Sequence, residues 1–273
     1  MAFNPAFTRR LLLSHGFGAA LMLPASVHAT GPRAVPRVAA SQGRPLVVVD
    51  PGHGGKDPGA IGVSGTYEKH AAFAVSGELA RQLRAGGYRV SLTRENDVFI
   101  PLEDRVAIAQ SHGAALFISV HADAVQDNTV SGASVYTLAD TASDTQTANL
   151  AVHENAADRY GGHALAGVSP QIAGILASLV QHETRAGSAR MQQNIVTALG
   201  HQTRLLDNPA RHAGFAVLKA ADIPSVLVEV GFMSNPLDEA ALAQARHRAA
   251  VASALRHAVD NFFAVGHSPA DVG

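Results

Sequence analysis

The sequence predicts an α/β fold: a single domain with a central, mostly parallel or mixed sheet flanked by helices. Short apolar runs rich in β-branched residues predict strands that are buried on both faces, as central parallel strands are; the clearest lie at 45–50, 116–121 and 225–230. Segments with helical periodicity separate these runs, and alternating strands and helices are typical of α/β domains. At 273 residues, with 47% hydrophobic and 16% charged residues, the chain suits one folded domain.

The elements follow one another in a regular order. Besides the three clear runs, weaker patterns predict strands at 88–93 and 134–138. Apolar residues at helical spacing predict helices at 70–85, 102–111, 143–158, 172–200 and 238–263. Thr66 is the expected N-cap of the first helix, which places Glu68 in its first turn.

The N-terminal segment, residues 1–29, reads as an export signal. Arg9 and Arg10 precede a short leucine-rich stretch, and the small-residue pattern ending at Ala29 predicts cleavage there and a periplasmic protein. The paired arginines resemble a twin-arginine signal, although an ordinary secretory signal fits too. No later stretch could span a membrane.

The rest of the chain divides into a lead-in, one domain and a tail. Proline and glycine predict a flexible lead-in at residues 30–44, and we expect one folded domain at 45–264 and a tail at 265–273. A net charge of −1 excludes a strongly basic nucleic-acid binder. Because the chain has no cysteine, any metal must be bound by His, Asp or Glu.

Three predicted strands lead into an ionisable residue. His53 follows the first strand, and His121 and Glu229 end two others. The carboxyl ends of parallel strands share one edge of a sheet, where ligands and catalytic groups gather in open α/β folds. One buried histidine alone would more often be structural, but three converging residues indicate a site.

These residues predict a zinc centre. His53 lies in a glycine-rich loop, and His53, Glu68 and His121 would give two imidazoles and one carboxylate, leaving a fourth position open for water. Glu68 could instead only balance the helix dipole. Imidazole ligands favour zinc over magnesium, while manganese or iron would fit less well. Glu229, in an otherwise apolar strand, is the candidate general base.

Five motifs in order resemble the zinc-dependent N-acetylmuramoyl-L-alanine amidases of the amidase type 3 family. They are DPGHGGKDPGAIG at 50–62, Glu68 with Lys69, LTR at 92–94, SVHADA at 119–124 and LVEVGFMSN at 227–235. The resemblance implies a fold similar to zinc carboxypeptidases, zinc ligands His53, Glu68 and His121, catalytic Glu229, and cleavage of the amide between N-acetylmuramic acid and L-alanine in peptidoglycan. Many relatives have Asn where this chain has Asp123, a change we do not expect to abolish metal binding.

A helical insertion at about 139–200 is expected to regulate the site. Its run ENAAD at 154–158 resembles the insertion of division-associated amidases, in which a helix covers the active site until an activator protein displaces it. The resemblance implies that Glu154 occupies the zinc and that the enzyme acts in cell separation. Glu154 could instead belong to a solvated helical face. The helix at 172–200 is a candidate docking face for the activator.

The sequence therefore predicts an exported zinc amidase that acts on peptidoglycan. Two alternatives remain open at this stage. A zinc peptidase would use the same metal chemistry on a peptide bond, and a non-catalytic wall-binding protein would keep only a vestigial site. Retention of the three ligands together with Glu229 argues against the second alternative, since a binding module needs no base beside a metal.

Overall fold

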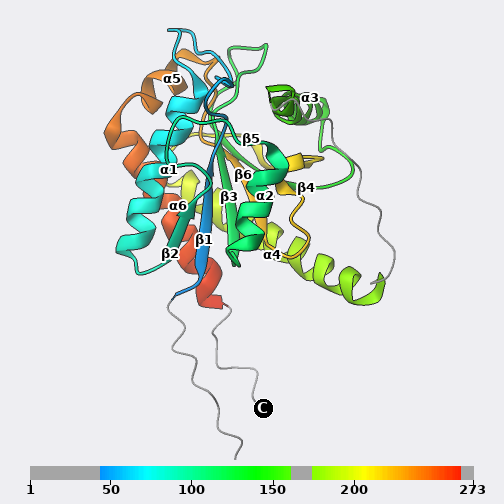
Figure 1. The fold of residues 1–273 in the computed structure, drawn as a ribbon. Helices are drawn as coiled ribbons and strands as arrows, with labels where there is room; N and C mark the ends of the chain where they lie inside the picture. Colours follow the sequence, from blue (N-terminus) through cyan, green and yellow to red (C-terminus); the bar gives the residue numbers. More distant parts are fainter. Residues whose placement is uncertain (1–43, 161–173, 266–273) are drawn as a thin grey trace, which may run out of the picture. The chain divides into compact units, whose positions relative to one another are not determined.

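The computed structural model describes residues 44–160 and 174–265, with side chains in the second part for residues 180–264. Six strands form one sheet in the order β2-β1-β3-β6-β4-β5 (Figure 1). Their bounds are β1 Leu46–Pro51, β2 Arg89–Leu92, β3 Leu116–His121, β4 Ala133–Leu138, β5 Leu205–Ala213 and β6 Ser225–Glu229. The strands β2, β1, β3 and β6 are parallel, whereas β4 runs antiparallel to β6 and carries β5 parallel to itself.

Helices cover both faces of this sheet. The helices are α1 Glu68–Ala85, α2 Leu102–Ser111, α3 Thr145–Asn155, α4 Gly174–Gly200, α5 Pro236–Leu242 and α6 Ala245–Val265, with short 3-10 turns η1 Ala156–Tyr160 and η2 Ala216–Leu218. Along β1, Val47 and Val49 pack in one core cluster with α1, α4 and α6, and Val48 packs in a second with α2, α3 and η2. Both faces of the central strands are therefore buried, as their continuous apolar runs predict.

The predicted α/β class and the five predicted strands are present. The strand β5 was not predicted, because its sequence LLDNPARHA carries charged and polar residues and Pro209. Proline is tolerated there because β5 lies at the edge of the sheet, where β4 is its one strand partner among the described residues. The prediction of one helix at 238–263 was also wrong: α5 ends at Leu242, and the Arg248 side chain donates to the carbonyls of Leu242 and Ala243 at that end.

The expected cap of α1 was wrong as well. The N-cap residue is Tyr67, not Thr66, and no side chain within the described ranges caps the helix. The Thr66 hydroxyl instead lies 3.1 Å from the Ser64 hydroxyl in the preceding turn. The helix α1 thus begins directly at Glu68, whose carboxylate faces the sheet edge described below.

The predicted signal peptide at 1–29, the lead-in up to residue 43 and the tail from residue 266 lie outside the described residues. Within the described part, no helix is long and apolar enough to cross a bilayer.

Candidate metal centre

The loop after β1 places His53 at the carboxyl edge of the sheet. The residue has a φ of 58°, in the left-handed region that non-glycine residues rarely adopt. Two buried arginines hold this backbone: Arg105 donates to the His53 carbonyl at 2.9 Å, and Arg94 donates to the Gly52 carbonyl at 2.9 Å. Strained backbone of this kind persists where the surroundings enforce it, and it is concentrated at functional sites.

Two glycines allow the backbone to approach the site closely. A Cβ atom on Gly52 would lie 2.5 Å from Cε1 of His121. A Cβ atom on Gly59 would lie 2.5 Å from the His53 ring and 2.6 Å from the Glu68 carboxylate, and Gly59 also has a positive φ. Glycine is therefore required at both positions to leave room for the side chains of the cluster.

Four buried side chains converge at this edge. The Nε2 atom of His53 lies 3.0 Å from Oε2 of Glu68, and Nδ1 of His121 lies 3.1 Å from Oε1 of Glu68. Glu154 on α3 completes the group, with one carboxylate oxygen 3.1 Å from Nδ1 of His121 and the other 3.7 Å from Nε2 of His53. One ligand atom from each of the four residues lies within 4.8 Å of the others, so together they can bind a metal ion.

The hydrogen bonding of this cluster fits a cation. Nδ1 of His53 pairs with the Asp57 carboxylate at 2.9 Å, which leaves Nε2 directed at the cluster. Neither this Nε2 nor Oε1 of Glu154 has a hydrogen-bond partner among the described residues, although both are buried. Buried polar atoms without partners are costly, and a shared cation would satisfy both.

Charge within the cluster shifts the pKa values in opposite directions. Burial raises the pKa of Glu68, but His53 and His121 overcome this and hold it well below its usual range. Burial lowers the pKa of His53, yet the carboxylates of Glu68 and Glu154 raise it to about 10. The carboxylates therefore favour positive charge between them, and a divalent cation would replace protons on the imidazoles.

Glu229 lies beside this group at the end of β6. It is the register partner of His121 on β3, and it is fully buried. Its Oε2 accepts a hydrogen bond from the Asp123 backbone N–H at 2.9 Å, while its Oε1 has no partner among the described residues. Burial, together with the nearby carboxylates, raises its pKa well above the usual value. A carboxylate with one free oxygen and a raised pKa is suited to accept a proton.

A second buried network, centred on Asp50, supports the loop that carries His53. The Asp50 carboxylate, at the end of β1, accepts hydrogen bonds from Thr93, Ser119 and Arg105. Burial would raise the pKa of Asp50, but Arg105 and the two hydroxyls lower it. Arg105 also donates to the His53 carbonyl, so this network fixes the backbone that presents the first imidazole.

Helix α3 and the η1 turn close the site. Glu154 is 3% exposed, and the remaining space beside His53, lined also by Asp57, Ala157 and Tyr160, is about 20 Å³. That volume suits about one water molecule. Beside Glu154, Nδ1 of His153 lies 3.1 Å from the Asp123 carboxylate, and the interaction raises the pKa of His153 to about 9.

The structure brings together His53, Glu68, His121 and Glu154, and places Glu229 next to them. Sequence reasoning missed Asp57, which orients His53, and the pair formed by Asp123 and His153. Asp57 lies four residues from His53 in the same loop, a local signal that could have indicated its contact. His153 is separated from Asp123 by 30 positions, and no local pattern connects them.

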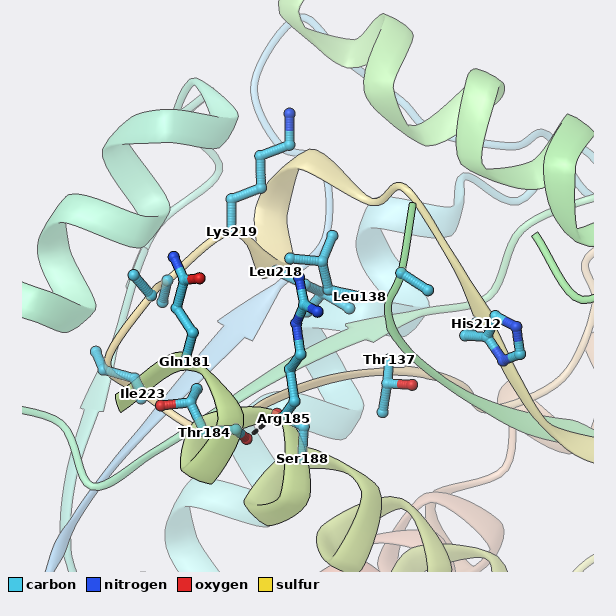
Figure 2. A pocket seen from close by; sticks show the side chains of 13 residues that line it. Thr137, Leu138, Gln181, Thr184, Arg185, Ser188, His212, Leu218, Lys219 and Ile223 are labelled. Carbon is cyan, nitrogen blue, oxygen red and sulfur yellow. Dashed lines mark hydrogen bonds between the residues drawn. The ribbon is translucent and has the colours of Figure 1, made fainter. Parts of the chain in front are cut away.

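A larger cavity of about 510 Å³ lies elsewhere. Figure 2 shows Gln181, Thr184 and Arg185 of α4 on one side of it, and Leu138 and Leu218 on another. The last residues of β4 and the segment before β6 line it. Because β4 runs antiparallel to β6, this is the edge of the sheet opposite the metal cluster. The cavity shares no residue with the cluster.

A His–Glu–His donor set at the carboxyl edge of an α/β sheet, with a further buried carboxylate beside it, is typical of metal-dependent hydrolases. The comparison with protein families identifies which kind of hydrolase this chain is. The family model described as N-acetylmuramoyl-L-alanine amidase matches residues 47–261, and the chain belongs to this family. Its reaction is therefore hydrolysis of the amide between N-acetylmuramic acid and L-alanine in peptidoglycan.

Individual relatives agree with this assignment. The chain is 39% identical to N-acetylmuramoyl-L-alanine amidase AmiA of Escherichia coli over 229 residues, which cover 84% of this chain and 79% of that protein. It is 37% identical to AmiC of Neisseria meningitidis over 220 residues, 80% of this chain but only 53% of the relative.

Solved structures share the fold. The amidase AmiC2 of Nostoc punctiforme is 28% identical, with a TM-score of 0.54, and the match covers 80% of this chain and 97% of that one. The catalytic domain of CwlV from Bacillus (Paenibacillus) polymyxa gives a TM-score of 0.58 at 24% identity, covering 81% of this chain and 99% of its own. The second comparison supports the fold alone.

Proposed function

We propose that this amidase is a zinc enzyme in which His53, Glu68 and His121 bind the metal and Glu229 is the general base. The observation that carries this proposal is the buried cluster, where an imidazole nitrogen without a hydrogen-bond partner faces the Glu68 carboxylate at 3.0 Å. Imidazole nitrogen with carboxylate oxygen is a donor set that zinc prefers. When bound, zinc polarises the scissile carbonyl and lowers the pKa of water toward neutrality.

Glu229 accepts the proton from the attacking water. The Asp123 backbone N–H holds one of its oxygens, so the other, which lacks a partner among the described residues, is oriented for this transfer. Its raised pKa lets it return the proton to the leaving amine of L-alanine.

The test compares Glu154→Ala, in which the carboxylate that contacts both imidazoles is removed, with the double variant Glu154→Ala and Glu229→Gln on purified cell wall. Glu154→Ala should release intact stem peptides beginning with L-alanine, detected by mass spectrometry. The double variant should bind zinc with unchanged stoichiometry and lose at least 100-fold in turnover, as expected for removal of a general base. Fragments cut within the stem peptide would instead support the zinc peptidase, and full activity of the variant would refute the role of Glu229.

We also propose that α3 inhibits the enzyme by placing Glu154 on the metal. The carboxylate lies within 3.1 Å of His121 and 3.7 Å of His53, in the position that water and substrate would need. Space of about 20 Å³ admits no part of a glycan-linked peptide. Glu154→Ala should hydrolyse cell wall without any activator, while Val152→Ala, at a residue 70% exposed on the same helix, should stay as inactive as the wild type.

The cellular setting belongs to the same proposal. An inhibited amidase needs an activator protein, and we infer one that displaces α3 during cell separation. The N-terminal pattern at 1–29 supports export to the periplasm, where peptidoglycan lies. Cell fractionation with and without residues 1–29 tests export. Deletion of the gene should give chains of unseparated cells if the protein acts in separation.

A further inference from the structure

The side chains of His153 and Asp123 join the inhibitory helix to the loop that follows β3. Nδ1 of His153 lies 3.1 Å from Oδ1 of Asp123. The Asp123 side chain is 1% exposed, whereas that of His153 is 47% exposed. The contact therefore connects a buried carboxylate with a half-exposed side chain that moves with α3.

The backbone around Asp123 holds its carboxylate in place. Oδ1 also accepts a hydrogen bond from the Ala124 N–H at 2.6 Å, and the Asp123 N–H donates to Glu229. A buried carboxylate that loses a hydrogen-bond partner is left unsatisfied, which is costly. His153 is thus the mobile half of the pair, and the free energy of the contact opposes movement of α3.

Other contacts fasten the two ends of α3 independently. At its start the Asp144 carboxylate caps the Thr147 N–H, and Arg211 lies 3.2 Å from Asp144. At its end the Asn155 amide bridges the Gly214 carbonyl and the Ala216 N–H. These contacts keep the helix formed and docked, but none of them reaches the metal cluster.

We propose that His153 is a positioning residue that, through its contact with Asp123, fixes the rotation of α3 so that the Glu154 carboxylate reaches both imidazoles. The inference rests on the proposed inhibition by Glu154 and specifies how this chain enforces it. His153 immediately precedes Glu154, so a rotation of the helix that separates His153 from Asp123 also withdraws the Glu154 carboxylate from the imidazoles. Any activator must break the contact between His153 and Asp123 before the site opens.

The test uses the zinc-loaded full-length protein and two readouts. The first is amide hydrogen exchange across Thr145–Asn155, and the second is the rate at which a chelator removes zinc. His153→Ala should raise both by about 3- to 10-fold, the range expected for the loss of one half-exposed hydrogen bond. His153→Gln, which keeps a donor, should fall between His153→Ala and the wild type. Val152→Ala, beside it on the same helix, is the matched control.

Two double variants separate positioning from general loosening. Asp123→Asn in the His153→Ala background should add little, because the contact is already lost. In the Glu154→Ala background, His153→Ala should no longer accelerate zinc removal, since its effect on zinc passes through Glu154. The proposal is overturned if His153→Ala matches Val152→Ala in both readouts, or if its effect on zinc persists without Glu154.

Failure of the proposed function has a different signature. If no variant hydrolyses cell wall, the assigned catalytic roles fail, yet hydrogen exchange still reports whether His153 holds α3. If Glu154→Ala stays inactive, while Glu229 proves essential in the enzyme activated by other means, only the proposed inhibition by Glu154 fails.

Discussion

Replacing Arg105 by Met should strongly destabilise the protein, because the buried Asp50 carboxylate would lose its countercharge. Arg105 is 1% exposed and Asp50 is fully buried, with the guanidinium 3.2 Å from the carboxylate. The same guanidinium also donates to the carbonyls of Ile100, Pro51 and His53. Breaking a buried ion pair from one side costs about 3–5 kcal/mol, a large part of the total stability of about 5–15 kcal/mol that is typical of a domain.

Urea unfolding of the metal-free protein, followed by circular dichroism, measures this loss. The control is Arg81→Met, which removes an exposed ion pair with Glu78 on α1 and should leave the midpoint unchanged. The double variant Asp50→Asn with Arg105→Met should recover part of the loss, because no unpaired charge remains. A loss of less than about 1 kcal/mol in Arg105→Met would refute the assignment, since it would place the pair among weak surface contacts.

The pH dependence of this ion pair follows from the lowered pKa of Asp50. An acid whose pKa is lower in the folded state contributes its stability above its unfolded pKa, near 3.8, and loses it as pH falls through the folded value. The difference between wild type and Asp50→Asn should therefore persist at pH 7 and shrink in strongly acidic solution.

Three further predictions concern the metal site. The pKa of Glu229 in the folded protein is raised well above 4.5, so this residue lowers folding stability as the pH rises above that value. Metal-free Glu229→Gln should therefore have a higher melting temperature than the wild type at pH 7 and the same melting temperature at pH 4. A lower melting temperature of the variant at pH 7 contradicts this. Asp57→Ala removes the acceptor that orients a metal-site imidazole, and zinc titration should show affinity reduced about 10- to 100-fold; unchanged affinity would count against that role. Gly52→Ala places a Cβ 2.5 Å from the His121 ring, so it should weaken zinc binding while the circular dichroism spectrum stays native. The control Gly77→Ala, with open space around its Cβ, should bind zinc as the wild type does. Equal zinc affinities of the two variants would show that the His121 ring can move away.

The sequence alone predicted the centre of the fold and several of the residues that meet at one edge of the sheet. Continuous apolar runs identify the buried parallel strands, and the rule that their carboxyl ends share one edge brings His53, His121 and Glu229 together. Predicting Glu68 as a ligand required its place in the first turn of a predicted helix as well as the family resemblance. These residues could be predicted because each follows an element whose hydrophobic pattern is strong.

Features that depend on long-range pairing could not be predicted. The strand β5 can hold polar residues and a proline because no other strand in the described part of the chain pairs with its outer edge, so its sequence resembles a loop. The break between α5 and α6 contains neither glycine nor proline and is completed by Arg248 from the next helix. The contacts of Asp50 with Arg105 and of Asp123 with His153 join distant segments, and only the folded chain shows them.

The register of β3 against β6 has a consequence for how this site tolerates variation. His121 and Glu229 face each other across neighbouring parallel strands, so backbone hydrogen bonds in the middle of the sheet set their separation. Loops that carry none of the site's residues can change without altering that spacing, whereas the loop after β1 carries His53, Asp57 and Gly59 and belongs to the site. A designer who wishes to redirect such an enzyme toward other amide substrates can therefore change the outer loops, provided that the two central strands and the loop after β1 are kept.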